Sequence, residues 1–205
     1  EFEICSIIAE KWVGKAYRLV IQRQRNWELD WQLYTAKWRV QMIRLAKDKD
    51  LDAIMKIYET ARKYMEETGN PSQWGKNHPP KELLEEDIKK EQLYVFTAED
   101  GILHGVFAFI IGADPIYAYI EDGKWLNDKE YGTIHRIAGD GAVKGVFDNC
   151  LAFCRDQISN LRIDTHHDNS TMQHLIGKNG FRRCGIVYME DGSPRIAYQY
   201  CLEDK

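Results

Sequence analysis

Residues 134–181 read IHRIAGDGAVKGVFDNCLAFCRDQISNLRIDTHHDNSTMQHLIGKNGF. The stretch begins with an apolar strand pattern and passes through a turn that contains Gly139, Gly141, Lys144 and Gly145. A helix pattern, a second strand pattern over 161–165 and a short helix pattern that ends at Gly180 follow. Strands and helices that alternate in this way predict an α/β arrangement around a sheet.

The first helix pattern in this stretch places its apolar residues on one face. These residues are Phe147, Cys150, Leu151, Cys154 and Ile158. The five cysteines are an odd number and form no Cys-x-x-Cys pair, which argues against a disulfide framework and a zinc knuckle. We therefore expect Cys150 and Cys154 to fill the core, in a protein of the reducing cytoplasm.

The composition is that of an ordinary soluble globular protein. The chain has 205 residues, a formal net charge of −4, a pI near 5.9 and a mean hydropathy of −0.52. The longest apolar run, 106–111, is far shorter than the roughly 20 residues that span a bilayer. We therefore expect no nucleic-acid partner, no membrane partner and a cytoplasmic location.

Residues 1–41 differ from the rest of the chain. They carry seven Lys or Arg against five Asp or Glu, a balance of +2, whereas the remainder has 21 against 27. They also contain four of the six tryptophans. We interpret them as an extension outside the native protein, from upstream translation or a cloning junction, with Met42 as the natural start. The alternative is an aromatic, basic docking arm for nucleic acid or membrane, for which +2 is a weak charge.

The pattern from residue 42 onward predicts one domain over 42–205. The expected strands are 42–46, 93–98, 102–112, 132–138, 161–165, 181–189 and 195–201, and the expected helices are 48–68, 81–91, 146–158 and 169–176. Asp100-Gly101 and Asp191-Gly192 are the expected hairpin turns. This order predicts an α/β (α+β) fold around a largely antiparallel sheet.

Three local motifs in this order resemble the GCN5-related N-acetyltransferase (GNAT) superfamily across residues 42–205. They are the opening strand 43–46 with Leu51 and Ile54, the central strand 134–138, and the segment from Asp168-Asn169 to Gly180-Phe181. The resemblance implies a mixed sheet of about seven strands with a splayed parallel pair. It also implies acetyl-CoA as co-substrate and no metal.

The resemblance assigns the cofactor site to the central strand and the turn after it. Free backbone groups of the strand would pair with the pantetheine arm, and the turn with the following helix N-terminus would bind pyrophosphate. The residues implied are Arg136, Ile137, Ala138, Val143, Lys144, Gly145, Val146 and Asn169.

The chain departs from the family pattern at two positions. The family pattern for this turn is Arg or Gln, two residues, Gly, one residue, then Gly or Ala. When the chain is aligned to it without gaps, Lys144 takes the first position, Phe147 the inner glycine position and Asn149 the last position. Phe147 either points into the core or obstructs the site, and its spacing favours the core. Ile176 stands where many members carry a tyrosine that protonates the leaving coenzyme A.

The attacking amine needs a base, and we predict His135 as the catalytic residue. It occupies a strand position where some members of the family carry a glutamate, and its ordinary pKa suits proton transfer near neutral pH. The alternative is that His135 only packs within the strand pair. His166, His167 and Asp164 are other candidate bases, although a solvated loop and an ordinary strand end also explain them.

Four aromatic residues lie in the two loops that wall the acceptor site in the family. As a substrate-binding set they would stack on a flat or cationic acceptor, and as a purely structural set they would anchor loops at the core edge. They are Trp74, Tyr117, Tyr119 and Trp125.

The leading hypothesis is an acetyl-CoA-dependent N-acetyltransferase that acts on a primary amine of a small molecule or peptide by direct attack. The competing hypothesis is a catalytically weakened GNAT-like protein that senses acyl-CoA or binds a partner, which Phe147 and Ile176 favour. The sequence does not decide whether the protein forms a homodimer.

Overall fold

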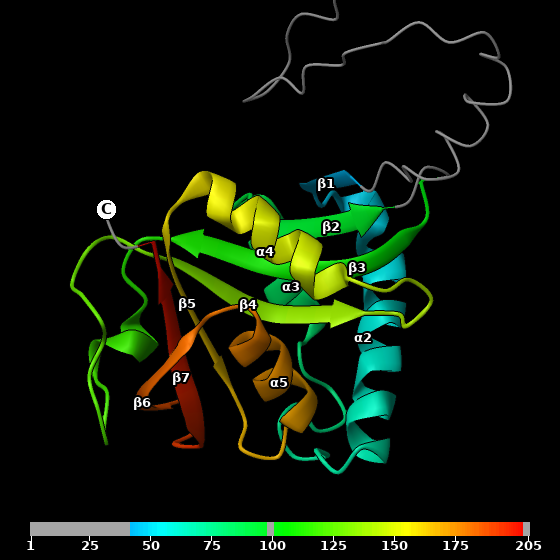
Figure 1. The fold of residues 1–205 in the computed structure, drawn as a ribbon. Coiled ribbons are helices and arrows are strands. Elements are labelled where there is room, and N and C mark those ends of the chain that lie inside the picture. Colours follow the sequence, from blue (N-terminus) through cyan, green and yellow to red (C-terminus); the bar gives the residue numbers. More distant parts are fainter. Residues whose placement is uncertain (1–41, 98–100, 203–205) are drawn as a thin grey trace, which may run out of the picture. The chain divides into compact units, whose positions relative to one another are not determined.

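The computed structural model describes residues 42–97 and 101–202, which form seven strands and four α-helices around one sheet (Figure 1). The strands are β1 (Met42–Leu45), β2 (Leu93–Thr97), β3 (Leu103–Ile111), β4 (Gly132–Gly139), β5 (Asn160–Thr165), β6 (Arg182–Tyr188) and β7 (Pro194–Cys201). The helices are α2 (Leu51–Glu67), α3 (Lys81–Lys89), α4 (Val146–Gln157) and α5 (Ser170–Lys178), with 3-10 turns η1 (Asp48–Asp50) and η2 (Pro115–Ala118). The predicted elements agree with these bounds to within a few residues.

Strands β4 and β5 form a parallel pair that separates after its first residues. The sheet order is β1-β2-β3-β4-β5-β7-β6, and every other neighbouring pair is antiparallel. Between β4 and β5 only Gly132–Leu161 and Thr133–Arg162 are in register, and beyond them the strands diverge (Figure 1). The predicted mixed sheet with a splayed parallel pair is therefore confirmed.

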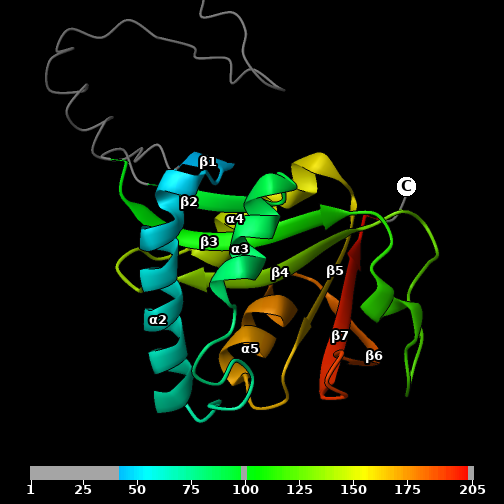
Figure 2. The ribbon, with the colours of Figure 1, turned by 180° about the vertical axis from the view of Figure 1, so that it is seen from behind.

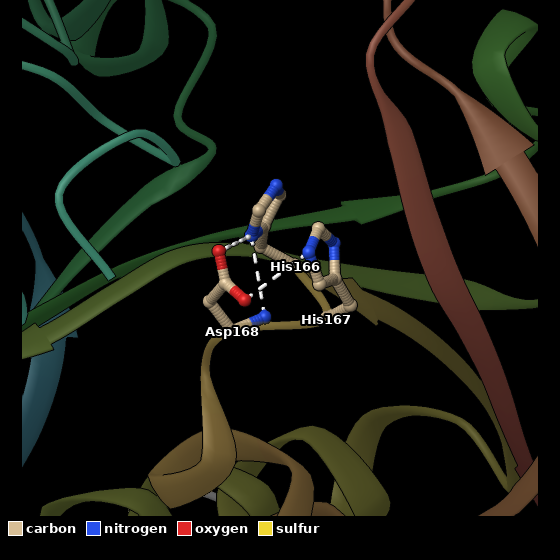
Figure 3. A group of neighbouring side chains, drawn as sticks. All are labelled: His166, His167 and Asp168. Atoms are coloured by element: carbon tan, nitrogen blue, oxygen red, sulfur yellow. Dashed lines mark hydrogen bonds and ion pairs between the residues drawn. The ribbon is translucent and has the colours of Figure 1, made fainter. Parts of the chain in front are cut away.

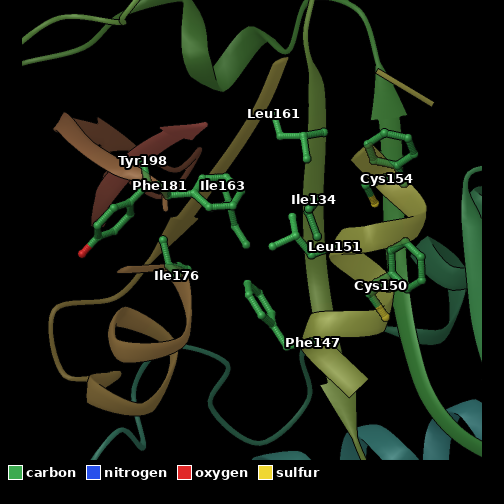
Figure 4. Packing of buried hydrophobic residues seen from close by; sticks show 12 residues of the cluster. Ile134, Phe147, Cys150, Leu151, Cys154, Leu161, Ile163, Ile176, Phe181 and Tyr198 are labelled. Atoms are coloured by element: carbon green, nitrogen blue, oxygen red, sulfur yellow. The ribbon is translucent and has the colours of Figure 1, made fainter. Parts of the chain in front are cut away.

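The helices cover the two faces of this sheet. Helix α4 lies on one face, and α2 and α3 lie on the other (Figures 1 and 2). Because side chains alternate along a strand, Phe107 and Phe109 of β3 join the core under α4 while Val106 and Ala108 join the core under α2. Residues of α5 belong to the α4 cluster, shown in Figure 4.

The apolar face predicted for α4 is buried as expected. Cys150 and Cys154 are fully buried within it, and burial raises the pKa of both thiols. A neutral, enclosed thiol is neither a ligand nor a nucleophile, so the prediction that these cysteines fill the core is confirmed.

The predicted extension over 1–41 lies outside the described residues. Within the described ranges, no helix combines the length and the apolar character needed to cross a lipid bilayer.

Candidate active site

The splay between β4 and β5 opens into a cleft of about 1820 Å³. Its walls come from α2, the 72–78 loop, β4, the 139–145 turn, the start of α4, the end of β5 and one side of α5. All eight predicted cofactor residues line it, as does His135. They are Arg136, Ile137, Ala138, Val143, Lys144, Gly145, Val146 and Asn169.

A β-bulge in β4 sits where the strands separate. Between the register pairs Val106–Ala138 and Ala108–His135, β4 has one more residue than β3, and Arg136 has a φ of 51°. The extra residue of a bulge leaves the hydrogen-bond ladder. The backbone of residues 136–137, which lies next to the cleft, therefore departs from regular strand geometry.

Two neighbouring helices hold this strained bulge. The hydroxyl of Tyr58 on α2 donates to the carbonyl oxygen of Arg136 at 2.8 Å, and an Arg136 Nη2 to Asp87 Oδ2 ion pair of 2.5 Å ties the side chain to α3. A non-glycine residue at positive φ persists when surrounding contacts fix it. Tyr58 and Asp87 provide those contacts.

The turn after β4 leads directly into the N-terminus of α4. Gly145 is the N-cap residue, with a φ of 79°, and Val146 begins the helix. The side-chain amide of Asn149 donates to the carbonyl oxygen of Gly145 at 2.8 Å. Gly145 therefore occupies a position whose backbone favours glycine, as does Gly141 with a φ of 77°, and Lys144 lies beside Gly145 at the cleft.

The two departures from the family motif both pack into the core. Phe147 is 7% exposed and Ile176 is fully buried, and both belong to the cluster that includes Ile134 and Leu151 (Figure 4). The interpretation that the spacing of Phe147 favours the core is confirmed. The side chains of α5 that line the cleft are instead Thr171, Met172, Leu175 and Lys178.

The N-cap residue of α5 also connects this helix to the loop on the other side of the cleft. The side-chain oxygen of Asn169 accepts from the backbone N–H of Met172 at 3.0 Å, as the Asn-led pattern predicts. Its amide donates to Gln73 Oε1, also at 3.0 Å.

His135 faces the other side of the splay and is paired with a carboxylate. Its Nε2 lies 2.7 Å from Asp114 Oδ2, and the two side chains are 13% and 10% exposed. Burial alone would raise the pKa of Asp114, but the hydrogen bond and charge of His135 outweigh it and lower that pKa. A carboxylate on one ring nitrogen fixes the tautomer and stabilises the protonated ring.

The other two predicted histidines sit outside the cleft walls. In the loop after β5, Asp168 lies 3.4 Å from His166 Nδ1 and 3.1 Å from His167 Nε2 (Figure 3). Burial, together with the charges of His167 and Arg195, lowers the pKa of His166. The three side chains have the ligand types of a metal site, but the backbone N–H of Asp168 already donates to His166 Nδ1 at 3.3 Å.

The four predicted acceptor aromatics do not gather at one site. Trp74 lines the cleft and packs edge-on against Tyr58. Tyr117 is 2% exposed and donates to Asp164 Oδ2 at 2.8 Å, while Trp125 covers the Arg162 guanidinium at 3.9 Å. Tyr119 is 63% exposed and, like Tyr117 and Trp125, is not part of the cleft wall. Of these four residues, only Trp74 therefore lies at the cleft, where an acceptor would bind.

Four further residues at the cleft or its bulge were not singled out from the sequence. Asp114 pairs with His135, Tyr58 and Asp87 hold the bulge, and Arg195 lines the cleft from β7. Each reaches the site across the sheet from a segment distant in sequence, so no local pattern marks it.

A search of solved structures gives close relatives for this fold. A GNAT-family acetyltransferase from Streptococcus agalactiae is 34% identical, with a TM-score of 0.70, and the match covers 82% of this chain and 99% of that one. The chain belongs to the GNAT family of acetyltransferases. The prediction of a GNAT acyltransferase, made from the motifs of the sequence, is therefore confirmed.

More distant GNAT structures support the fold. A family member from Listeria monocytogenes is 20% identical over 79% of this chain and 95% of its own, with a TM-score of 0.60. A Salmonella typhimurium protein solved with its cofactor acetyl-CoA is 15% identical over 80% of this chain and 95% of its own, with a TM-score of 0.51. No protein-family model and no curated protein sequence matches the chain.

Proposed function

We propose that this GNAT protein transfers an acetyl group from acetyl-CoA to the primary amine of a small molecule or peptide by direct attack. The observation that carries the proposal is the splayed β4–β5 cleft, which collects every cofactor residue expected from the family. One structural neighbour has acetyl-CoA as its cofactor, which supports the choice of donor.

The cofactor would lie along β4 and end at the N-terminus of α4. Pantetheine amides would pair with backbone groups of Arg136, Ile137 and Ala138, which have no neighbouring β5 residue in register. The pyrophosphate would meet exposed backbone N–H groups of the turn, the positive end of the α4 dipole and the Lys144 ammonium. Phe147 packs into the core with 7% of its surface exposed, and it borders the cleft beside this path.

In the chemical step, the amine nitrogen attacks the thioester carbonyl carbon and a C–N bond forms. The C–S bond then breaks, and coenzyme A leaves as a thiolate with the bonding electron pair. A backbone N–H at the bulge would stabilise the oxyanion between these events. The products are the N-acetyl amine and coenzyme A, so no acyl-enzyme and no redox partner is required.

His135 would take the proton that the amine must lose. Asp114 holds its Nε2, and within the described residues Nδ1 makes no hydrogen bond and is the nitrogen left for a substrate or water. The imidazolium that forms would be stabilised 2.7 Å from the Asp114 carboxylate. The thiolate would be protonated by solvent, since Ile176 offers no proton.

Calorimetric titration with acetyl-CoA, followed by thiol release over a panel of amines, tests the proposal. We expect binding of acetyl-CoA and release of one thiol per acetylated amine. Absence of acetyl-CoA binding would overturn the proposal. Binding without thiol release from any amine would favour the acyl-CoA sensor instead, for which Phe147 at the cleft and the apolar Ile176 are the arguments.

A further inference from the structure

Arg195, at the start of β7, is a buried cation in the cleft wall. The residue is 8% exposed, and Nη1 donates to the carbonyl oxygen of Pro194 at 2.9 Å. Among the described residues, no carboxylate oxygen lies within 4.0 Å of its guanidinium. A guanidinium has five N–H donors, so most of its hydrogen-bonding capacity is left for a ligand.

In the described part of the chain, the other buried arginine, Arg162, and the half-buried Arg136 both have partners. Arg136 forms an ion pair with Asp87, and Arg162 lies between the rings of Trp125 and Tyr131 and donates to the Asn127 carbonyl. A buried charge without a partner is costly, and proteins keep one mainly where a ligand completes it. Arg195 is therefore the exception that needs an explanation.

Arg195 lies on the face of the sheet that carries the predicted base. Ala197, two residues along β7, is opposite Asp164 and packs in the Tyr117 cluster, so Arg195 shares that face. His135 is on the same face, since it is opposite Ala108 and its ring lies 6.0 Å from that of Tyr117. The cofactor turn enters α4 on the opposite face, so Arg195 is at the acceptor end.

The charge of Arg195 acts on its neighbours without forming an ion pair with any of them in the described residues. Burial, and then the charges of Arg136 and Arg195, lower the pKa of His78 in the loop across the cleft. Burial lowers the pKa of Arg195, whereas the charges of Asp164 and Asp191 raise it. Neither carboxylate forms an ion pair with Arg195: Asp164 accepts from Tyr117 at 2.8 Å, and Asp191 accepts from the backbone N–H of Ser193 at 2.9 Å. The positive charge of Arg195 therefore acts on a group across the cleft.

We propose that Arg195 binds the carboxylate, or an equivalent anionic group, of the acceptor. The acceptor is then an amino acid or a similar small zwitterion, held by its anion at Arg195 while its amine faces the thioester near His135. This inference rests on the proposed function and narrows its substrate class. A fork of N–H donors binds a carboxylate in two parallel hydrogen bonds, which fixes the orientation of the amine.

The experiment uses L-amino acids and, matched to each, the methyl ester, which keeps the amine and removes the anion. Thiol release is measured for the wild-type chain and for Arg195→Gln, Arg195→Lys and the exposed-arginine control Arg183→Gln. Acetyl-CoA binding by each variant, measured by calorimetry, shows whether the cofactor site and the fold persist.

We expect the wild-type enzyme to prefer the free acids, with kcat/KM about 10- to 100-fold above the esters, the usual size for a hydrogen bond to a charged group. Arg195→Gln should remove this preference, Arg195→Lys should restore part of it, and Arg183→Gln should keep it. Equal turnover of acids and esters, or a preference that survives Arg195→Gln, would overturn the inference while the acetyltransferase proposal stands.

If no amine releases thiol, the same ligands are titrated against the protein saturated with coenzyme A. Binding of the acids but not the esters, lost in Arg195→Gln, would support the anion site even though acetyl transfer had failed. Absence of any difference between acids and esters would overturn it. Failure of acetyl-CoA to bind at all is a separate result, which counts against the proposed function itself.

Discussion

The two sides of the β4–β5 splay are built in different ways. The proposed cofactor side is, apart from Asn169, one continuous segment, residues 136–146, whose backbone, glycines and helix N-terminus would do most of the binding. The acceptor side is assembled from side chains of four separate elements, with Asp114, His135, Asp164 and Arg195 as its charged or ionisable members. A binding site made of backbone groups follows from one short stretch of sequence, whereas a site made of side chains depends on how distant segments come together in the fold.

The largest expected effect is on the acceptor side. Replacing His135 with Gln removes the base beside Asp114, and kcat should fall by about 100-fold or more because general-base catalysis is lost. The acetyl-CoA Kd should not change, since the ring faces away from the turn and α4. Steady-state thiol release and calorimetry measure the two quantities.

The matched control is His167→Gln, in an exposed loop outside the cleft wall. It should leave kcat within about twofold of wild type, as surface substitutions usually do. If His167→Gln lowered kcat as much as His135→Gln, the assignment of the base to β4 would be wrong.

The next effect is on the cofactor side. Gly145→Val places a β-branched residue at a φ of 79°, where nothing but Asn149 Nδ2 lies near the added Cβ. Left-handed backbone costs such residues roughly 1–2 kcal/mol, so the acetyl-CoA Kd should rise about tenfold. Calorimetric titration measures it, and kcat at saturating acetyl-CoA should be nearly unchanged.

Gly177→Ala on α5 is the control for this substitution. Its Cβ meets no atom within 4 Å and no positive φ is required, so the helix should gain stability and the Kd should stay constant. An unaltered Kd in Gly145→Val would mean that the turn does not bind the cofactor through its present backbone shape.

A smaller effect is expected at the bulge, where the two sides meet. Tyr58→Phe removes the hydroxyl that donates to the Arg136 carbonyl, and the free energy of unfolding should fall by about 1 kcal/mol. Urea titration measures the change. Tyr64→Phe, which loses only an exposed hydrogen bond to Thr171, should change it by less than about 0.5 kcal/mol.

The smallest effect is a pH dependence from Asp114. The ordinary pKa of 3.8 is lowered in the folded protein: burial opposes the shift, and the His135 hydrogen bond and charge produce it. Such a carboxyl adds stability above its unfolded pKa, and this contribution is lost as the pH falls through the folded pKa. Below pH 4, urea stability should therefore fall less steeply in Asp114→Asn than in wild type.

The exposed Asp128→Asn is the control for that acid-range measurement, and it should follow the wild-type slope. A wild-type slope in Asp114→Asn would show that the Asp114–His135 pair contributes nothing to acid stability.

Sequence reasoning recovered the helices and strands, and it predicted the cofactor segment, from local patterns. Amphipathic spacing marks each helix, and alternation or apolar runs mark each strand, so α4 with Phe147 on its buried face was predictable. The strand order was not, because nothing local shows that β7 enters between β5 and β6. The place of His135 in a strand was predictable. Its pairing with Asp114 was not, because Asp114 lies in a loop that comes next to β4 only in the folded protein.

The sequence by itself determined the helices, the strands and the glycine-bearing turn at the N-terminus of α4, since periodicity and glycine positions act over a few residues. The GNAT fold was expected from the resemblance of its motifs to the family. Only the tertiary structure decided that Tyr58 and Asp87 fix a bulge at Arg136, and that Arg195 at the cleft wall has no carboxylate partner in the described part of the chain. Those features depend on burial and on pairing between distant side chains, which exist only once the sheet and its helices have assembled.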